Sequence, residues 1–300
     1  MHDLIIVGAG PAGLTASIYA VRYGLDVLLI DILPIGGQIS SARLVENYPG
    51  FSRISGIELM EKFVEHASDV GVQMKEASVS EVVSISNGFE IVTGSERIPS
   101  KAVIIATGAK PKLLGIHGEI EFTGRGVSYC ATCDAPFFSG KKVAVIGGGE
   151  TAITEALVLS DIAKQVTVIH RRNSLRASQI LQERAFARDN IDFVWNTVVE
   201  EIAGNELVDR IHVRNVISGK KSTISVEGVF IYVGVLPNTD LVDVKKNEQG
   251  FIVSNEAMET SVPGIFAAGD CRESLLHQVI TAAADGAVAA YSAQKFVRGK

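Results

Sequence analysis

Two cysteines separated by two residues, Cys130 and Cys133, are followed directly by an acidic residue, Asp134. Two thiols at this spacing close a small disulfide ring, and such a motif lowers the pKa of one thiol well below the free value of about 8.5. The neighbouring carboxylic acid could pass a proton to or from a departing thiolate. The same C-x-x-C spacing is also half of a zinc site, so the motif alone leaves a redox dithiol and a metal site open.

The cysteine count narrows this choice. The chain of 300 residues contains three cysteines, which is too few for a disulfide framework. The third, Cys271, has no partner nearby in the sequence, and we expect it to be a small buried hydrophobic residue. A binding or sensor module that holds zinc would need four ligands, and the sequence has neither a second C-x-x-C nor a close pair of histidines. No metal site is therefore predicted.

The charge and hydropathy of the sequence argue against a nucleic-acid-binding protein and against a secreted or membrane protein. The formal net charge of −6 is unsuited to a protein whose main task is binding nucleic acid. The first residues, Met1-His2-Asp3, lack the cationic start of a signal peptide, and no apolar run approaches the roughly 18 residues of a membrane span. We expect a cytoplasmic protein that binds neither nucleic acid nor membrane and is long enough for two domains.

The N-terminal segment has the pattern of a dinucleotide-binding unit. An apolar strand over residues 3–7 enters a glycine-rich turn, a helical pattern follows through Tyr23, and a second strand over 26–30 ends at Asp31. In such a G-x-G-x-x-G turn the first glycine permits the bend, the second lets the backbone approach a pyrophosphate, and the third lets helix and strand pack closely. The candidate binding residues of this turn are Gly8, Gly10, Pro11, Ala12 and Gly13.

A second unit of the same design follows the cysteine pair. A strand over residues 142–146 enters a glycine-rich turn, and a helix and a further strand over 165–169 come next. The candidate binding residues of the second turn are Gly147, Gly149, Glu150, Thr151 and Ala152. Asp31 and His170 each lie 23 residues after the first glycine of their turn, so they take the same strand-end position.

The two strand ends differ in charge. A carboxylate such as Asp31 suits a free ribose 2′-hydroxyl and repels a 2′-phosphate. His170 is followed by three arginines whose guanidinium groups would bind a dianionic phosphate: Arg171, Arg172 and Arg176. The first unit is therefore predicted to hold an unphosphorylated adenosine, as in FAD or NAD, and the second to hold NADP(H).

The rest of the chain is predicted from its periodicity and its glycine and proline residues. Helices are expected over residues 57–70 and 174–188, several strands over 72–104, a strand around Trp195, and loops over 34–39, 47–51 and 234–239. A further strand ends at Gly269-Asp270, and a helix of small residues opens at 277–280. A helix start beside a strand-end acid suits a flavin ring, because the helix dipole stabilises negative charge on the reduced ring.

In order and spacing these motifs resemble the low-molecular-weight thioredoxin reductases of bacteria and archaea, from Leu4 nearly to the C-terminus. The matching stretches are Gly8–Gly13, Gly36–Ile39, Ala106–Gly108, Cys130–Asp134, Gly147–Ala152, His170–Ala177, Gly234–Asn238, Gly264–Asp270 and His277–Val279. Relatives of the glutathione reductase type carry their redox pair in the first domain, whereas residues 32–60 of this chain contain no cysteine. The resemblance implies an α/β fold with two Rossmann-like, three-layer dinucleotide-binding domains, the second inserted into the first.

The resemblance also implies domain bounds and residue roles. An FAD-binding domain would comprise residues 1–112 and 240–300, and an NADPH-binding domain carrying the cysteine pair would comprise 113–239, within a homodimer. Asp31 would meet the adenosine ribose, and Asp270 would bind the ribityl chain. The remaining residues of the FAD site would be Gly37, Gln38, Asn47, Ala106, Thr107, Gly108, Gly269, Gln278 and Val279. Cys133 would exchange electrons with the flavin, Cys130 would attack the disulfide of thioredoxin or a thioredoxin-like protein, and Asp134 would be the general acid/base.

Four positions depart from the family pattern. The family usually has Glu where Asp31 stands, often has Asp-Ser where Glu150-Thr151 stands, and commonly has Arg at the position of His277. The shorter acid should still reach a ribose. The change at His277 concerns contacts of the flavin or thioredoxin and leaves the reaction class as it is.

The implied activity is the NADPH-dependent reduction of a thioredoxin disulfide through FAD and the cysteine pair. The inserted domain would rotate about the segments near Pro111 and Pro237, which brings the cysteine pair and the nicotinamide to one flavin in turn. Two alternatives are a dithiol oxidase of the same fold that passes electrons to oxygen, and a reductase fed by a reduced flavin or ferredoxin. The arginines after His170 count against both, because neither alternative requires a 2′-phosphate site.

Overall fold

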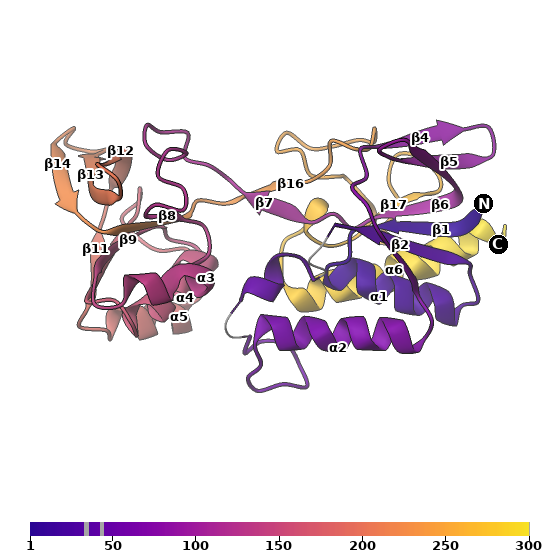
Figure 1. The fold of residues 1–300 in the computed structure, drawn as a ribbon, viewed down its shortest axis with the longest axis horizontal. Helices are drawn as coiled ribbons and strands as arrows, with labels where there is room; N and C mark the ends of the chain where they lie inside the picture. Colours follow the sequence, from indigo (N-terminus) through magenta and orange to yellow (C-terminus); the bar gives the residue numbers. More distant parts are fainter. Residues whose placement is uncertain (33–35, 43–44, 300) are drawn as a thin grey trace. The chain divides into compact units, whose positions relative to one another are not determined.

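The computed structural model describes residues 1–32, 36–42 and 45–299, apart from the side chains of Ser41, Thr132 and Cys133. The chain divides into two compact units, one formed by Met1–Lys110 with Leu236–Lys300 and the other by Pro111–Val235 (Figure 1). No helix of the described residues combines the length and the apolar character that crossing a membrane requires.

The discontinuous unit is built on a seven-stranded sheet with the order β3-β2-β1-β6-β5-β4, in which β17 also pairs with β6. The strands are β1 His2–Val7, β2 Val27–Asp31, β3 Gln73–Glu76, β4 Glu81–Ile85, β5 Gly88–Thr93, β6 Glu96–Ile105 and β17 Ile265–Ala267. Pairing is parallel among β3, β2, β1, β6 and β17, and antiparallel from β6 through β5 to β4. The carboxyl ends of β1, β2, β6 and β17 therefore meet at one edge of the sheet.

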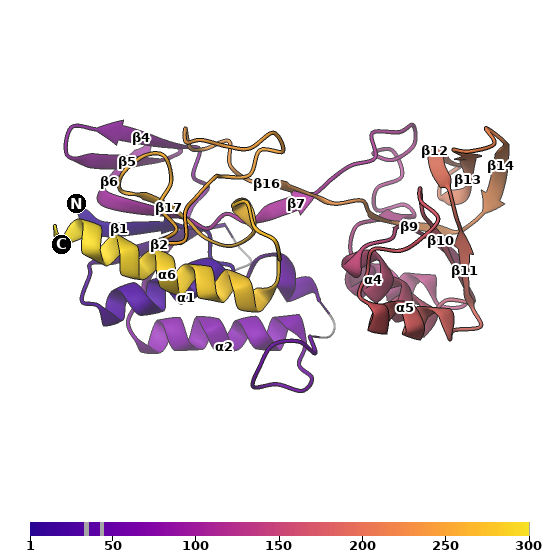
Figure 2. The ribbon, with the colours of Figure 1, turned by 180° about the vertical axis from the view of Figure 1, so that it is seen from behind.

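Three helices pack together on one side of this sheet (Figures 1 and 2): α1 Pro11–Arg22, α2 Gly56–Asp69 and α6 Val279–Val297. Side chains alternate along β1, so Leu4 and Ile6 join the core that contains the residues of α1 and α6, while Ile5 and Val7 join the core on the opposite face. A Cβ atom on Gly286 of α6 would lie 2.1 Å from the carbonyl oxygen of Ala12. Only glycine therefore allows α6 to approach the start of α1 so closely.

The second unit has a five-stranded parallel sheet in the order β11-β10-β9-β15-β8. Its strands are β8 Val127–Ser128, β9 Lys142–Gly147, β10 Gln165–Ile169, β11 Ile191–Val194 and β15 Gly228–Tyr232. The helical elements are α3 Ala131–Asp134, η2 Ala135–Phe138, α4 Glu150–Ser160 and α5 Gln179–Phe186. An antiparallel sheet is formed by β12 Thr197–Gly204, β13 Val208–Asn215 and β14 Lys221–Ser225.

The second unit has three layers, as its two cores show. Val143 and Val145 of β9 join one core with residues of α3 and α4. The alternate residues, Ala144 and Ile146, join the other core with residues of β12 and β13. The predicted fold class, two Rossmann-like α/β domains built on parallel sheets, is confirmed.

The loop predicted over residues 234–239 is wrong in its middle. Val235–Pro237 forms strand β16, which pairs with β7, Ala109–Pro111, in a two-stranded sheet. The N–H of Lys112 also donates to the carbonyl oxygen of Gly234 at 2.9 Å. The backbone N–H and C=O groups of the two segments form hydrogen bonds with each other. The glycine and proline residues of the sequence indicated a loop and gave no sign of this pairing.

Three further local predictions need correction. The helix predicted over 174–188 is restricted to Gln179–Phe186, because the backbone before it is held elsewhere: the N–H of Arg176 donates to the carbonyl oxygen of Gly148 at 2.6 Å. Trp195 lies in the turn between β11 and β12 rather than on a strand. In the segment predicted as a loop over 34–39, Gly37–Ser41 forms the 3₁₀ helix η1, and Pro34 and Ile35 lie outside the described residues.

Candidate functional site

The first glycine turn is tightly packed on the protein side and open on the other. A Cβ on Gly8, whose φ is +106°, would lie 2.3 Å from the carbonyl oxygen of Ala106, and a Cβ on Gly13 would lie 1.7 Å from that of Gly8. A Cβ on Gly10 would meet nothing within 4 Å. Helix α1 starts at Pro11, which is suited to a first helical position because its missing N–H needs no partner there. The open space at Gly10 fits the close approach of a phosphate.

Asp31 lies against this turn. Its Oδ2 accepts the N–H of Ala9 at 2.6 Å, and its Oδ1 accepts the N–H of Ile32 at 2.7 Å. The strand register places Ile30 and Ile105 on either side of Val7, so Asp31 and the segment 106–108 follow neighbouring strands at the carboxyl edge. The structure thus brings the first turn, Asp31 and residues 106–108 together.

The segment Ala106–Gly108 is hydrogen-bonded to a segment that is distant in the sequence. Thr107 Oγ1 donates to the carbonyl oxygen of Asn238 at 2.5 Å, and Asn238 Nδ2 donates to that of Thr107 at 3.0 Å. The N–H of Asn238 also donates to the carbonyl oxygen of Gly108 at 2.9 Å. Gln38 Nε2 donates to the carbonyl oxygen of Ala109, which brings η1 to the same region. Asn238 was not among the predicted site residues, although it ends a stretch that matches the family.

The start of α6 contacts a second predicted residue. Gln278 is the N-cap of α6, which begins at Val279, and its Oε1 accepts Asn47 Nδ2 at 2.9 Å. His277, the preceding residue, lies beside the ring of Phe251 with the ring centres 5.4 Å apart. His277 Nε2 is buried and has no hydrogen-bond partner among the described residues. Asn47, Gln278 and Val279 are therefore neighbours, as expected for residues of one site.

Gly269 and Asp270 follow β17, and the backbone of Gly269 is held by a partly buried ion pair. Asp285 Oδ2 accepts the N–H of Gly269 at 3.1 Å and Arg272 Nη1 at 3.1 Å. Burial raises the pKa of Asp270; the charge of His277 opposes this shift and the carboxylate of Asp285 adds to it. The predictions from sequence missed Arg272 and Asp285, since nothing in their spacing shows that they meet.

The second glycine turn repeats the first. A Cβ on Gly147, whose φ is +152°, would lie 2.4 Å from the carbonyl oxygen of Tyr232, and a Cβ on Gly148 would lie 2.4 Å from His170 Nδ1. A Cβ on Gly149 would meet nothing closer than Arg176 Nη2 at 3.8 Å. Here too the middle of the turn is open where the start of α4 would face a phosphate.

The three predicted residues on α4 have different environments. Glu150 accepts hydrogen bonds from the N–H of Ser178 at 2.8 Å and from its hydroxyl at 2.9 Å, so it fixes the segment that leads into α5. Thr151 is exposed beside it, and Ala152 is buried against the turn. The carboxylate of Glu150 thus joins the loop carrying the arginines to the glycine turn.

His170 is buried, with 4% of its surface exposed, and its Nε2 has no partner among the described residues. Burial lowers the pKa of His170, and the charges of Arg176, Arg172 and Arg171 lower it further, against a hydrogen bond with the backbone of Ser174. The three arginine residues are exposed around it. A neutral imidazole with exposed guanidinium groups nearby is a suitable environment for a phosphate dianion.

The cysteines are in two different states. Cys130 is disulfide-bonded, whereas Cys271 is free and buried. Burial raises the pKa of Cys271 to about 11, and its Sγ lies 3.3 Å from the carbonyl oxygens of Ile105 and Ala268, so the prediction of a buried structural thiol is confirmed. The side chain of Cys133 lies outside the described residues, while its backbone belongs to α3.

The backbone on either side of Cys130 is held by hydrogen bonds. Ser128 Oγ accepts the N–H of Cys130 at 3.0 Å, and Tyr232 Oη accepts the N–H of Ala131 at 2.7 Å. The N–H of Asp134 donates to the carbonyl oxygen of Cys130 at 3.2 Å, which closes the turn of α3. Asp134 is therefore on the same short helix as Cys133, and Cys130 directly precedes that helix.

A buried carboxylate accepts three hydrogen bonds from the part of the chain before the cysteine motif. Glu119 is fully buried and accepts the N–H groups of Leu114 and Gly115 and the hydroxyl of Tyr129, at 2.9, 2.7 and 2.8 Å.

Within the described part of the chain, no group of three or more histidine, cysteine, aspartate or glutamate residues could hold a metal ion.

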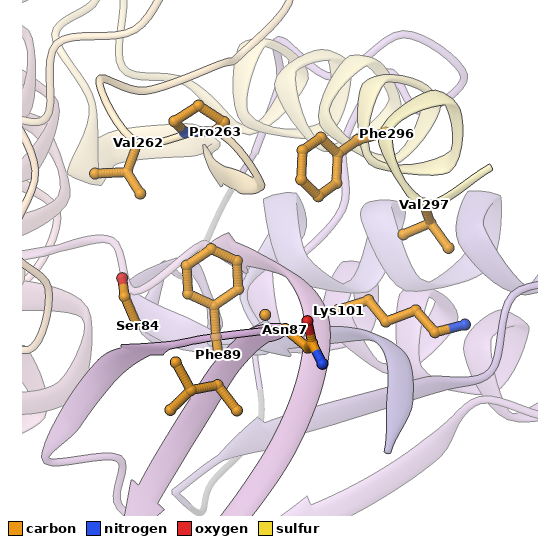
Figure 3. A pocket seen from close by; sticks show the side chains of 10 residues that line it. Ser84, Asn87, Phe89, Lys101, Val262, Pro263, Phe296 and Val297 are labelled. Carbon is orange, nitrogen blue, oxygen red and sulfur yellow. The ribbon is translucent and has the colours of Figure 1, made fainter. Parts of the chain in front are cut away.

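A hollow of about 500 Å³ lies elsewhere in the discontinuous unit (Figure 3). It is lined by the turn between β4 and β5, by Lys101 and by the ends of α6 and of the loop before β17, with Phe89 and Phe296 on its walls. Lys101 Nζ is paired with Asp3 at 2.7 Å. None of the predicted site residues lines this hollow, which is far along the strands from the carboxyl edge.

Comparisons with known proteins agree with this geometry. The family model for pyridine nucleotide-disulphide oxidoreductases matches residues 2–286. The thioredoxin reductase of Bacillus subtilis is 45% identical over 300 residues, which cover 99% of this chain and 95% of that protein. The crystal structure of Lactococcus lactis thioredoxin reductase has a TM-score of 0.97 and 39% identity over 100% of both chains. That of T. acidophilum thioredoxin reductase has a TM-score of 0.94 and 38% identity over 98% of both chains. The chain therefore belongs to the pyridine nucleotide-disulphide oxidoreductases, a family that uses a flavin and a nicotinamide, and within it to the low-molecular-weight thioredoxin reductases.

Proposed function

We propose that this protein is an NADPH-dependent FAD enzyme that reduces the disulfide of thioredoxin, or of a thioredoxin-like protein, through Cys130 and Cys133. The observation that carries the proposal is the difference between two otherwise matching strand ends. Asp31 stands at the first, whereas a buried His170 among three exposed arginines stands at the second. One site suits a ribose with free hydroxyl groups and the other a ribose 2′-phosphate.

The first site has the features that FAD requires. The open space at Gly10 leaves room for a pyrophosphate, and Asp31 would accept a hydrogen bond from the adenosine ribose. Asp270 would bind the ribityl chain. The other residues that would hold FAD are Gly8, Pro11, Ala12, Gly13, Gly37, Gln38, Asn47, Ala106, Thr107, Gly108, Gly269, Gln278 and Val279. When bound, the flavin supplies two-electron transfer between a nicotinamide and a disulfide.

The second site has the features that NADPH requires. The pyrophosphate would lie at the open middle of the turn, against Gly147, Gly149 and the N-terminus of α4 with Glu150, Thr151 and Ala152. Arg171, Arg172 and Arg176 would bind the 2′-phosphate through charge-assisted hydrogen bonds. The neutral His170 beneath them adds no further charge and can accept or donate one hydrogen bond.

The cysteine pair would carry the electrons to the protein substrate. Cys133 faces the flavin in this proposal, and reduction of the Cys130–Cys133 disulfide leaves two thiols. Asp134 would take the proton from the Cys130 thiol, and the resulting thiolate would attack one sulfur of the thioredoxin disulfide to form a mixed disulfide. The other thioredoxin sulfur leaves as a thiolate, to which Asp134 returns the proton. Cys133 then attacks Cys130, which restores the internal disulfide and releases the second thioredoxin sulfur. Each turnover therefore moves two electrons to thioredoxin.

The proposal extends to the assembly of the enzyme. Residues 1–112 and 240–300 would form the FAD domain and 113–239 the NADPH domain, in a cytoplasmic homodimer. The paired crossover strands β7 and β16 would be the axis about which the NADPH domain turns.

An anaerobic titration tests the proposal. The purified protein should be yellow. Two equivalents of NADPH, one for the Cys130–Cys133 disulfide and one for the flavin, should bleach its flavin absorbance, whereas NADH at the same concentration should act far more slowly. Oxidised thioredoxin added afterwards should restore the absorbance. A colourless protein, or one that responds equally to NADH, would contradict the assignment. Bleaching by reduced ferredoxin but not by NADPH would favour the alternative electron donor. Bleaching by a small dithiol, followed by rapid recovery when oxygen is admitted, would favour the oxidase.

A further inference from the structure

Tyr232 belongs by its backbone to the second glycine turn. It is the last residue of β15, and its register partner on β9 is Gly147, the first glycine of that turn. Its carbonyl oxygen lies so close that a Cβ on Gly147 would be only 2.4 Å away. A displacement of the Tyr232 backbone would therefore also displace the glycine turn.

The side chain of Tyr232 belongs to the cysteine motif. Its Oη accepts the N–H of Ala131 at 2.7 Å, and Ala131 is the first residue of α3, directly after Cys130. Ala131 is fully buried, so water has no access to replace this acceptor. The first N–H groups of a helix have no partner within the helix, and this one depends on the tyrosine.

The charges around Tyr232 keep its hydroxyl in the neutral form. Burial raises the pKa of Tyr232 above the usual value, and the carboxylates of Glu155 and Asp134 raise it further, against the hydrogen bond from Ala131. Glu155 lies on α4 and Asp134 on α3, so the phenol is influenced by a carboxylate of each helix. A neutral hydroxyl still accepts the Ala131 N–H with a lone pair throughout the working pH range.

We propose that Tyr232 is a positioning residue that ties α3 to the second glycine turn and so holds Cys130 ready for exchange with thioredoxin. This inference rests on the proposed function. In the proposed reaction Tyr232 contacts neither thioredoxin nor the flavin. It acts through the N–H of Ala131. Loss of the hydroxyl leaves a buried N–H without an acceptor and loosens the start of α3, while the backbone of the turn stays in place.

The test compares two half-reactions in the holoenzyme. Tyr232→Phe should lower kcat with thioredoxin by about tenfold, the order expected for one lost hydrogen bond to a buried group. The rate of flavin reduction by NADPH in a stopped-flow experiment and the KM for NADPH should stay within about twofold of the parent values. A general loss of folded protein would lower both half-reactions equally, and that result would overturn the proposal.

Tyr129→Phe is the matched control. It removes a phenolic oxygen from the residue on the other side of Cys130, but that oxygen donates to Glu119 and not to α3. Both half-reactions of Tyr129→Phe should stay within about twofold of the parent. A selective loss in this variant equal to that of Tyr232→Phe would overturn the proposal, because any missing phenol would then have the same effect.

Amide hydrogen exchange in the unmodified holoenzyme tests the same tie without a substitution and covers the case in which Tyr232→Phe does not fold. The N–H of Ala131 is buried and donates to Tyr232, so it should exchange as slowly as the N–H groups of the neighbouring strands. Exchange as fast as that of exposed N–H groups would overturn the proposal. An unmodified enzyme that fails to reduce thioredoxin with NADPH would refute the proposed function itself, whereas an active enzyme with an equally active Tyr232→Phe variant would refute only this inference.

Discussion

The open middle of the second glycine turn gives a prediction whose size follows from the structure. Gly149 is the N-cap of α4 with φ −93° and ψ −176°, an extended conformation that any residue adopts. An added Cβ would have only Arg176 Nη2 near it, at 3.8 Å. In Gly149→Ala, the lower entropy of the unfolded chain stabilises the fold by about 0.4–1 kcal/mol, and alanine's poorer capping offsets this by a similar amount. The free energy of unfolding should therefore change by less than about 0.5 kcal/mol.

The same methyl group would fill the space through which a pyrophosphate approaches the backbone. Forcing an extra methyl group into a filled site costs about 1–3 kcal/mol, which raises the dissociation constant of NADPH by about 5- to 150-fold. The assay is the NADPH concentration dependence of flavin reduction in rapid mixing, together with urea unfolding of the same preparation. Flavin content should be that of the parent.

The matched variant is Gly10→Ala in the first turn, where an added Cβ also meets nothing within 4 Å. It should fold but lose flavin, while NADPH still binds to its own unit. Gly149→Ala with an NADPH affinity within twofold of the parent would refute the argument, and so would Gly149→Ala that loses flavin instead.

Three further predictions concern other groups of the site. Arg176→Gln, which removes the guanidinium nearest to Gly149, should raise the KM for NADPH about tenfold and leave that for NADH unchanged, and an equal change in both would exclude a 2′-phosphate contact. Glu119→Gln should lower the free energy of unfolding in urea by about 1–3 kcal/mol, because an amide offers one acceptor atom where the carboxylate accepts three donors, whereas the exposed Glu121→Gln should stay within about 0.5 kcal/mol. His170 has a lower pKa in the folded protein than in the unfolded chain, so as the pH falls the unfolded chain binds a proton at this residue before the folded protein does. The contribution of His170 to the free energy of unfolding is therefore fully present above about pH 6.5 and decreases as the pH falls below that value. His170→Asn should therefore flatten the decline of unfolding free energy between pH 7 and pH 5, and an unchanged slope would show that His170 is not responsible.

The elements that carry a local pattern could be predicted from the sequence. Each glycine turn stands between two apolar strands, and the equal interval to Asp31 and His170 follows from the length of one strand–turn–helix–strand unit. The helix over Gly56–Asp69 was visible because its apolar residues recur with the helical period and Ser55 with Glu58 forms a capping box. The parallel sheets, and with them the fold class, followed from these units.

The features that depend on distant partners could not be predicted. Glu119 looks like an ordinary polar residue of a loop, and its burial becomes clear only when Tyr129 and the backbone of Leu114 are brought to it. Strands β7 and β16 have three residues each, too few for a periodic signal, and exist because they pair with each other. Tyr232 reads as one more aromatic residue in a strand, since its contact with Ala131 spans 101 residues of sequence.

The path of electrons from NADPH to thioredoxin through Cys130 is tested most directly by one single-turnover experiment with the Cys130→Ser variant. The parent holoenzyme is reduced anaerobically with two equivalents of NADPH, and the variant, which has no Cys130–Cys133 disulfide, with one equivalent. Each is then mixed with an excess of oxidised thioredoxin, while flavin absorbance is followed. The parent enzyme should regain its oxidised spectrum and release reduced thioredoxin. The variant should bleach with NADPH at the parent rate and then stay bleached. Recovery of the variant at the parent rate would contradict the account.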